Sequence, residues 1–455
     1  METPIRIIVS YIWNLILLFP LSIAAQMTSG SLAATQTLTL QQCIEVALQN
    51  SRRLGIAKAR IEQAEFKYKE TRSYNFPVLR TQFLYTHLSR ITPTTISFPI
   101  PINGQSEFAL NPNIQNFFQY QLAVQQPIFN GLRTRRDYLA NRFLHQASQK
   151  DLLKEQLEVE YNVKNYYWNL YRVRKQKEIL EENLAQVNAH LKDVENFLQQ
   201  GLATQNDLLK VKLQSSNVRL ALISVENSIQ TVNAALCNEM GYPLTTTIVP
   251  ASTPEVDEYE LALPEMSRLT DNALFNRPDL RTLKLQYKAA EVQYRLGWSE
   301  FAPFLNFQGK LDYNNPNQRI FPLEQKFNLT WDWTFALTYE LWSWGKRFHL
   351  LRQAKSVMRQ TQGYIGMLED GIKLEVKQNY LDIQRAREQI TLARETVLQA
   401  EENFRVGQDK FKQGLLLNSE LLDAEVLLLE SRNNLLAAQV DYQLSRARLN
   451  KAVGQ

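Results

Sequence analysis

The sequence contains little cysteine, histidine, glycine and proline. Among its 455 residues there are 2 Cys, 4 His, 15 Gly and 16 Pro. The low glycine and proline counts argue against a loop-rich protein. The four histidines and two distant cysteines have no ligand spacing, which argues against a metal site. No apolar run after the N-terminus is long enough for a membrane-spanning helix, and the mean hydropathy is −0.33, so a helical membrane protein is excluded. The net charge of +5 comes from interspersed acids and bases, and no basic block indicates a nucleic-acid partner.

The N-terminus differs from the rest of the chain. Arg6 precedes an apolar run over residues 7–21, and small residues follow it at Ser22, Ala24 and Ala25. This order predicts a secretory signal peptide over residues 1–25. The alternative is an N-terminal anchor helix, for which the run is short and interrupted. Export would bring Cys43 and Cys237 into an oxidising compartment. We favour two free thiols there, with a disulfide as the alternative.

Residues 327–341 carry the clearest strand pattern. Every odd position is large and apolar, and nearly every even position is polar, with Ala336 the exception. Period two over this length predicts a strand with one apolar and one polar face. Most soluble strands have ~5–6 residues, whereas a tilted strand that crosses a bilayer has ~9–11. The pattern therefore favours a membrane strand over a long strand of a soluble sandwich.

Long helices dominate the remainder. Residues 132–199 contain neither Pro nor Gly and repeat apolar residues every three to four positions, which predicts one helix of ~100 Å. Gly201 ends it, and a second helix follows over 205–240. We further expect a helix over 39–73 with a local break at Asn50-Ser51. The other expected elements are strands over 78–97, 118–125 and 305–313, and loops over 91–116 and 314–326.

The chain repeats this order. Ala47 and Pro77 return as Ala273 and Pro303 at one constant offset, and Gly201 returns as Gly414 at another. A long helix over 347–413 and a final helix to Ala452 complete the second copy. The sequence therefore predicts an internal tandem duplication. Its first structural repeat is 38–243, its linker 244–264 and its second repeat 265–455.

Two strands per repeat give four strands per chain, which cannot close a barrel. Because open sheet edges are not tolerated in lipid, the chain must oligomerise, and three copies supply twelve strands. In each repeat the two shorter helices together match the long one in length, so they can lie end to end beside it. The moderate apolar content of the helices suits a wall with water on both sides. The alternative is a set of ordinary coiled coils without a lumen.

Several motifs occur in order along the chain. They are Leu38-Thr39-Leu40, Ala47-Leu48-Gln49-Asn50, Phe76-Pro77, Gln126-Pro127-Ile128-Phe129-Asn130-Gly131, Asn276-Arg277-Pro278-Asp279-Leu280, Phe301-Ala302-Pro303, and the run from Gly414 to Asp423. Together with the duplication they resemble the TolC-like outer-membrane efflux protein family over the whole mature region.

The resemblance implies a mixed α and β fold. It implies a homotrimer with a 12-stranded transmembrane β-barrel in the cell outer membrane, continuous with a long α-helical barrel in the periplasm. The implied function is a passive duct of a tripartite efflux or type I secretion system. Its implied partners are a periplasmic adaptor (membrane fusion protein), an inner-membrane pump of RND, ABC or MFS type, and outer-membrane lipid.

Other function classes fit less well. A trimeric structural or adhesive stalk is the alternative, but here long helices follow the strands in both repeats instead of forming one N-terminal stalk. No catalytic triad, nucleotide loop or metal-ligand spacing indicates an enzyme, and no cofactor is expected. The exported cargo is not readable from the residues.

The resemblance also assigns candidate residues at the periplasmic tip. Glu420 and Asp423 match acidic positions that line the narrow aperture, and they share a helix face because they are three apart; two ordinary surface acids are the alternative. Asp207 matches a position that helps to hold the tip closed. Leu416 and Phe411 depart from the family pattern, in which an Arg and a Tyr make closing links, so this chain must close differently.

The tip turns and the tryptophans are further candidates. Gly201-Leu202 and Gly414-Leu415 are expected to meet the adaptor, although Gly suits a tight turn whatever the function. Trp331, Trp333, Trp342 and Trp344 are expected to be interfacial aromatic anchors. A core or trimer-contact role is the alternative for any one of them.

Overall fold

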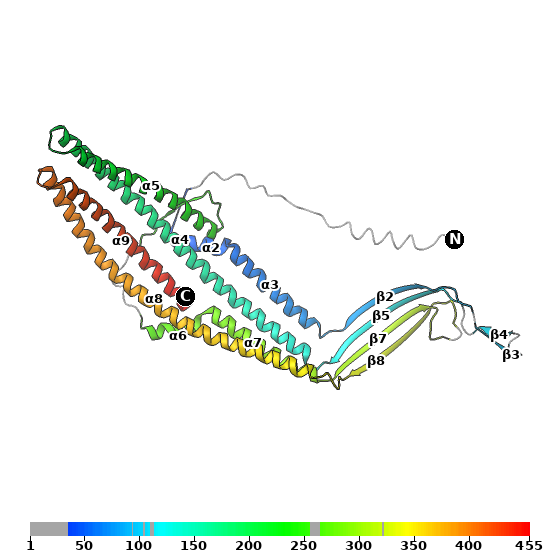
Figure 1. Cartoon of the computed structure of the whole chain (residues 1–455). Helices are drawn as coiled ribbons and strands as arrows, with labels where there is room; N and C mark the ends of the chain where they lie inside the picture. The colour runs from blue at the N-terminus through cyan, green and yellow to red at the C-terminus, as the bar shows by residue number, and fades with distance from the viewer. Residues whose placement is uncertain (1–34, 93, 103–104, 110–112, 255–263, 321–322) are drawn as a thin grey trace.

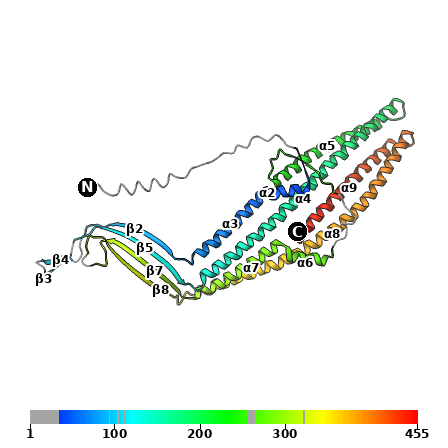
Figure 2. The same ribbon diagram turned by 180° about the vertical axis from the view of Figure 1, so that it is seen from behind.

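The computed structural model describes residues 35–455 except 93, 103–104, 110–112, 255–263 and 321–322. The predicted signal peptide, residues 1–25, lies outside these residues. The molecule is long and narrow, with a β-sheet at one end and two helix turns at the other (Figure 1). The C-terminus lies part-way along the helical region in both views (Figures 1 and 2). Among the described residues, no helix is long and apolar enough to cross a membrane.

The two halves of the chain contain matching helices. α4 (Arg133–Gln199) and α8 (Lys346–Lys412) each have 67 residues. α5 (Gln205–Met240) and α9 (Asn418–Val453) each have 36. The shorter helices that precede the strands in the sequence are α2 (Leu40–Asn50), α3 (Arg52–Ser73), α6 (Met266–Asn276) and α7 (Pro278–Gly297). These lengths agree with the predicted helices and with the predicted break after Asn50.

The short helices lie in series along the long ones. α3 and α5 both pack against α4, and α7 and α9 both pack against α8. α7 and α9 also contact α4, so they join the two halves. Each 67-residue helix is ~100 Å long, which agrees with the predicted end-to-end arrangement.

The four main strands form one antiparallel sheet in the order β2-β5-β7-β8. The strands are β2 (Val78–His87), β5 (Asn116–Phe129), β7 (Phe304–Asn315) and β8 (Asn328–Thr338). β5 and β7 pair across the two halves, with Tyr120 opposite Tyr313. The sheet is therefore a single unit built from both repeats, and β2 and β8 form its edges.

The strand predicted over 327–341 is shorter than expected. Its last pair with β7 is Phe304↔Thr338. The residue before Phe304 is Pro303, which has no backbone N–H to extend the ladder. The strand predicted over 78–97 likewise leaves the sheet after His87.

The prediction of a loop over residues 91–116 was wrong. This segment contains a separate hairpin of β3 (Thr95–Ile102) and β4 (Gln105–Ala109). Pro99 and Pro101 had indicated a loop. They lie where the β3–β4 register is irregular, between Ser97 and Ile102, and proline is tolerated in edge strands and at irregularities.

The linker predicted over 244–264 also contains regular structure. β6 (Thr247–Pro250) pairs in parallel with β1 (Thr35–Leu38), so the start of the first repeat is bound to the segment that follows it. Strands of four residues are too short to show a periodic pattern, which explains why the sequence did not predict them.

Cys43 on α2 and Cys237 on α5 are fully buried in the same apolar cluster, and both are free thiols. The favoured prediction of two free thiols is thus confirmed. Burial, with a smaller contribution from Cys237, raises the pKa of the Cys43 thiol to about 12.

Candidate functional site

The α4–α5 and α8–α9 turns form the far end of the helical region, here called the tip. Gly201 and Gly414 adopt positive φ angles of 74° and 71°. A Cβ at either position would meet no atom within 4 Å. The left-handed backbone, and not crowding, therefore explains glycine in both turns.

Each turn exposes a leucine. The backbone N–H of Leu202 donates to Phe197 O at 2.8 Å, and that of Leu415 donates to Lys410 O at 2.9 Å, which closes each helix end. The Leu202 and Leu415 residues are 72% and 70% exposed. The predicted adaptor-contact residues thus present two apolar groups at the outermost point of the helices.

The Asp207 side chain takes part in a helix cap. Its Oδ2 accepts a hydrogen bond from Thr204 N at 3.0 Å, and its own N–H donates to Thr204 Oγ1 at 3.2 Å. The hydrogen bond from the Thr204 side chain is the largest influence that holds the pKa of this carboxyl below its ordinary value. This capping box fixes the start of α5. Asn418 Nδ2 also donates to Asp207 O at 3.3 Å, so the two hairpins are tied together here.

Glu420 has a related position at the start of α9. Its Oε2 accepts from Leu417 N at 3.3 Å. Leucine has no side-chain acceptor to complete a reciprocal cap, so α9 has half of the arrangement seen at α5. Glu420 is solvent-exposed in the single chain.

Asp423 lies in a groove between α5 and α9 of about 350 Å³. Lys210, Leu422 and Ser419 line the same groove. Asp207 lines a different groove of about 560 Å³ between the two turns, together with Phe411 and Leu416. The structure therefore brings Asp423 together with a base that the sequence analysis missed, and it separates Asp423 from Asp207. No local pattern signals this placement, because Lys210 and Asp423 lie on different helices far apart in the sequence.

Phe411 and Leu416, the two departures from the family pattern, pack in an apolar cluster. Phe411 is 6% exposed, and its ring centroid lies 5.5 Å from that of Phe197 on α4. Leu416 packs against the same cluster, whose buried members are Val187, Val194, Leu208, Val211, Phe411 and Leu421. Within one chain, apolar packing joins the two hairpins where the family pattern has polar links.

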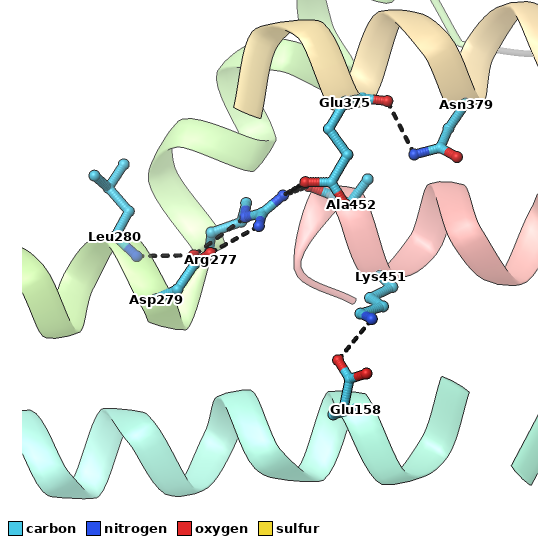
Figure 3. Close-up of polar contacts among 8 residues, drawn as sticks. All are labelled: Glu158, Arg277, Asp279, Leu280, Glu375, Asn379, Lys451 and Ala452. Atoms are coloured by element: carbon cyan, nitrogen blue, oxygen red, sulfur yellow. Dashed lines mark hydrogen bonds and ion pairs between the residues drawn. The ribbon is translucent and has the colours of Figure 1, made fainter. Parts of the chain in front are cut away.

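A second polar site lies midway along the helices, where α6 meets α7 (Figure 3). Arg277 donates to both carboxylate oxygens of Asp279, at 3.1 and 2.7 Å, pairs with Glu375 on α8, and donates to Ala452 O on α9 at 3.3 Å. Close by, Lys451 pairs with Glu158 on α4 at 2.6 Å. Burial alone would raise the pKa of the Asp279 carboxyl, but the hydrogen bonds and charge of Arg277 outweigh it and hold that pKa below its ordinary value. This junction fixes the end of α9 against three other helices.

The tryptophans fall into two groups. Trp331 and Trp333 lie on the apolar face of β8, whose large side chains are 58–69% exposed: Leu329, Trp331, Trp333, Phe335 and Leu337. Trp342 and Trp344 follow β8 and form an edge-to-face pair with centroids 6.1 Å apart. On the opposite face of the sheet, Gln121 donates to Asp312 at 2.9 Å and Arg319 pairs with Asp332 at 2.9 Å. The predicted division into an apolar and a polar face is present.

Comparisons with known proteins agree with this architecture. The family model described as "Outer membrane efflux protein" matches residues 43–241 and 269–455. "Outer membrane efflux protein BepC" of Brucella suis biovar 1 (strain 1330) is 19% identical over 325 residues, which are 70% of this chain and 69% of that protein.

Two solved structures show the same fold. The outer membrane protein VceC from Vibrio cholerae has a TM-score of 0.75 and 19% identity, and the match covers 91% of this chain and 96% of that one. The Campylobacter jejuni CmeC outer membrane channel has a TM-score of 0.78 and 17% identity, covering 91% and 85%. The TolC-like fold predicted from the sequence is confirmed. The chain belongs to the outer membrane efflux protein family, as an outer-membrane efflux duct with a large helical periplasmic portion.

Proposed function

We propose that three copies of this chain form the duct of a tripartite efflux or type I secretion system. The observation that carries the proposal is the four-stranded sheet, in which β2 and β8 have no partner on their outer sides among the described residues. Each unpaired backbone group would cost several kcal/mol in lipid. Pairing β8 of one copy with β2 of the next satisfies both edges and closes twelve strands.

The two faces of the sheet support the same arrangement. The exposed apolar face of β8 contacts lipid, and the face with Asp312 and Asp332 lines the water-filled mouth. Trp331 and Trp333 lie within this lipid face. The Trp342–Trp344 pair lies at the helical end of the sheet. It anchors the barrel at the periplasmic interface of the outer membrane.

At the tip, Leu202 and Leu415 on the Gly201 and Gly414 turns contact a periplasmic adaptor of an RND, ABC or MFS pump. Their exposure and the groove between the turns support this contact. Glu420 and Asp423 line the aperture, with Lys210 beside Asp423. Asp207 acts through its cap, as a positioning residue for the start of α5.

The duplication gives such a trimer six similar helical units. We take residues 38–243 and 265–455 as the repeats, with 244–264 as the connection. The equal lengths of α4 and α8, and of α5 and α9, support this division.

Site-specific photo-crosslinking in intact cells tests the proposal. A crosslinker in place of Leu202 or Leu415 should capture a periplasmic protein with a helical hairpin. A crosslinker in place of Phe275, which is 74% exposed but lies on α6 near mid-length, should not. The purified protein should be a trimer that conducts ions in planar bilayers. A monomer, or equal capture at all three positions, would contradict the proposal.

A further inference from the structure

His190 on α4 and Glu425 on α9 form a buried pair between the two hairpins. Nδ1 of His190 lies 3.2 Å from Oε1 of Glu425. His190 is 5% exposed and Glu425 is 1% exposed. The sequence analysis assigned nothing to either residue.

The surroundings of the pair are apolar. The ring of Phe411 on α8 stands edge-on to His190 at 5.0 Å, and α5 contributes Leu208 and Val211 to the same cluster. Among the described residues, both ring nitrogens of His190 and Oε2 of Glu425 lack a hydrogen-bond partner. The two groups are thus within ion-pair distance but are not aligned for a hydrogen bond.

Other charged groups on these helices have different partners or positions. Glu195 on α4 pairs with Lys212 on α5 at 3.8 Å, and Asp409 on α8 pairs with Arg405 at 3.2 Å. Further charged positions near the tip are Lys192 and Asp193 on α4, Lys410 and Lys412 on α8, Asp207, held in its cap, Lys210 and Asp423, which line the α5–α9 groove, and Glu420, held in the half-cap of α9. Among the described residues, Glu425 is the charged group within ion-pair distance of His190.

A buried carboxylate is costly unless a positive charge compensates it. An imidazole ordinarily changes charge between about pH 5 and 8. When His190 carries a proton, its positive charge cancels the negative charge of Glu425. When that proton is lost, the negative charge of Glu425 is buried without a compensating positive charge. The proton equilibrium is therefore coupled to how tightly α4 and α9 pack.

Several other polar ties between the hairpins do not respond in this range. Arg432 on α9 pairs with Glu182 on α4 at 3.3 Å, Lys451 on α9 pairs with Glu158 on α4 at 2.6 Å, and Asn418 donates to Asp207 O at 3.3 Å. Arginine stays charged and asparagine stays neutral across this range.

We propose that His190 and Glu425 are a proton-operated latch between the two helical hairpins: the tip is held together when His190 is protonated and loosened when it is neutral. Only the consequence for transport, a wider tip at higher pH, rests on the proposed function. The latch itself goes beyond it.

Hydrogen exchange of the full-length protein in detergent tests the latch without any partner. After correction for the chemical exchange rate, peptides around residues 185–195 and 420–430 should exchange at least about tenfold faster at pH 8 than at pH 6, the range over which imidazole titrates. His190→Gln and Glu425→Gln should each abolish the pH difference. His145→Gln is the matched control, because His145 lies on the same helix but stacks on Tyr68, outside the tip cluster.

The latch is refuted if the wild-type protein shows no pH difference in these peptides, or if either tip variant keeps it. Should His190→Gln fail to assemble, Glu425→Gln decides alone, because it removes the charge at nearly unchanged shape. A bilayer recording separates the two proposals. Hydrogen exchange that depends on pH, without any ion conduction, would overturn the duct and support the latch. Ion conduction with the same hydrogen exchange at both pH values would overturn the latch alone.

Discussion

Replacing Arg277 by methionine should loosen the junction midway along the helices. The substitution keeps much of the side-chain volume but removes the donors to Asp279, Glu375 and Ala452 O. Removal of one partner from a buried ion pair costs ~3–5 kcal/mol. The side chains of Asp279 and Glu375 are 22% and 41% exposed, so solvent recovers part of this loss. We expect a cost of about 2–3 kcal/mol.

Hydrogen exchange is the assay, because it reports local opening without requiring reversible global unfolding. A cost of this size corresponds to roughly 30- to 150-fold faster exchange in residues 266–280 and 446–455. Arg295→Met on α7 is the matched control. Its ion pair with Glu291 is exposed, with side-chain exposures of 64% and 38%, so little change is expected. Equal exchange in the two variants would refute the reasoning.

The same variant should alter the response to acid. Because the pKa of Asp279 is held below its ordinary value, the carboxylate contributes stability at neutral pH, and this contribution is lost as the pH falls through the native pKa. Arg277→Met should therefore lose less stability than the wild type as the pH falls below about 4. An unchanged acid response would contradict the assigned role of Arg277.

Three further predictions concern the tip and the core. Asp423→Asn with Glu420→Gln should shift ion selectivity in planar bilayers toward anions, while Lys210→Gln should shift it toward cations, because the groove charge changes in opposite directions; unchanged reversal potentials would exclude an aperture role. Gly414→Ala should cost about 1–2 kcal/mol locally, since its φ is +71° but a Cβ has space, and it should speed exchange only around residues 408–420. Cys43, with a pKa of about 12 and no exposure, should resist maleimide at pH 8 until the chain is denatured; labelling of the native protein would contradict its burial.

Patterns that are local in the sequence were predictable. The uninterrupted helical periodicity gave α4 and α8 to within one or two residues, and the break after Asn50 was visible in the same way. The alternation in β8 gave its two faces but not its end, because the end depends on where the neighbouring strand β7 begins, directly after Pro303. β3 and β6 were missed since prolines or short length concealed them.

The candidate site depended more on contacts between distant segments. The family resemblance supplied the acidic positions near the Gly414 turn as predictions, but neither the cap that holds Asp207 nor the placement of Lys210 beside Asp423 was predicted. Neither residue type nor spacing shows which carboxylate already has a partner.

The sequence by itself determined the duplicated order of elements, the lengths of the helices and the two faces of the sheet, because hydrophobic periodicity is set by neighbouring residues. Only the tertiary structure decided which side chains meet across the two halves. His190 and Glu425, Arg277 and Glu375, and the parallel strands β1 and β6 are far apart in the chain. Their partners and their burial follow from how four long helices pack, which no local pattern encodes.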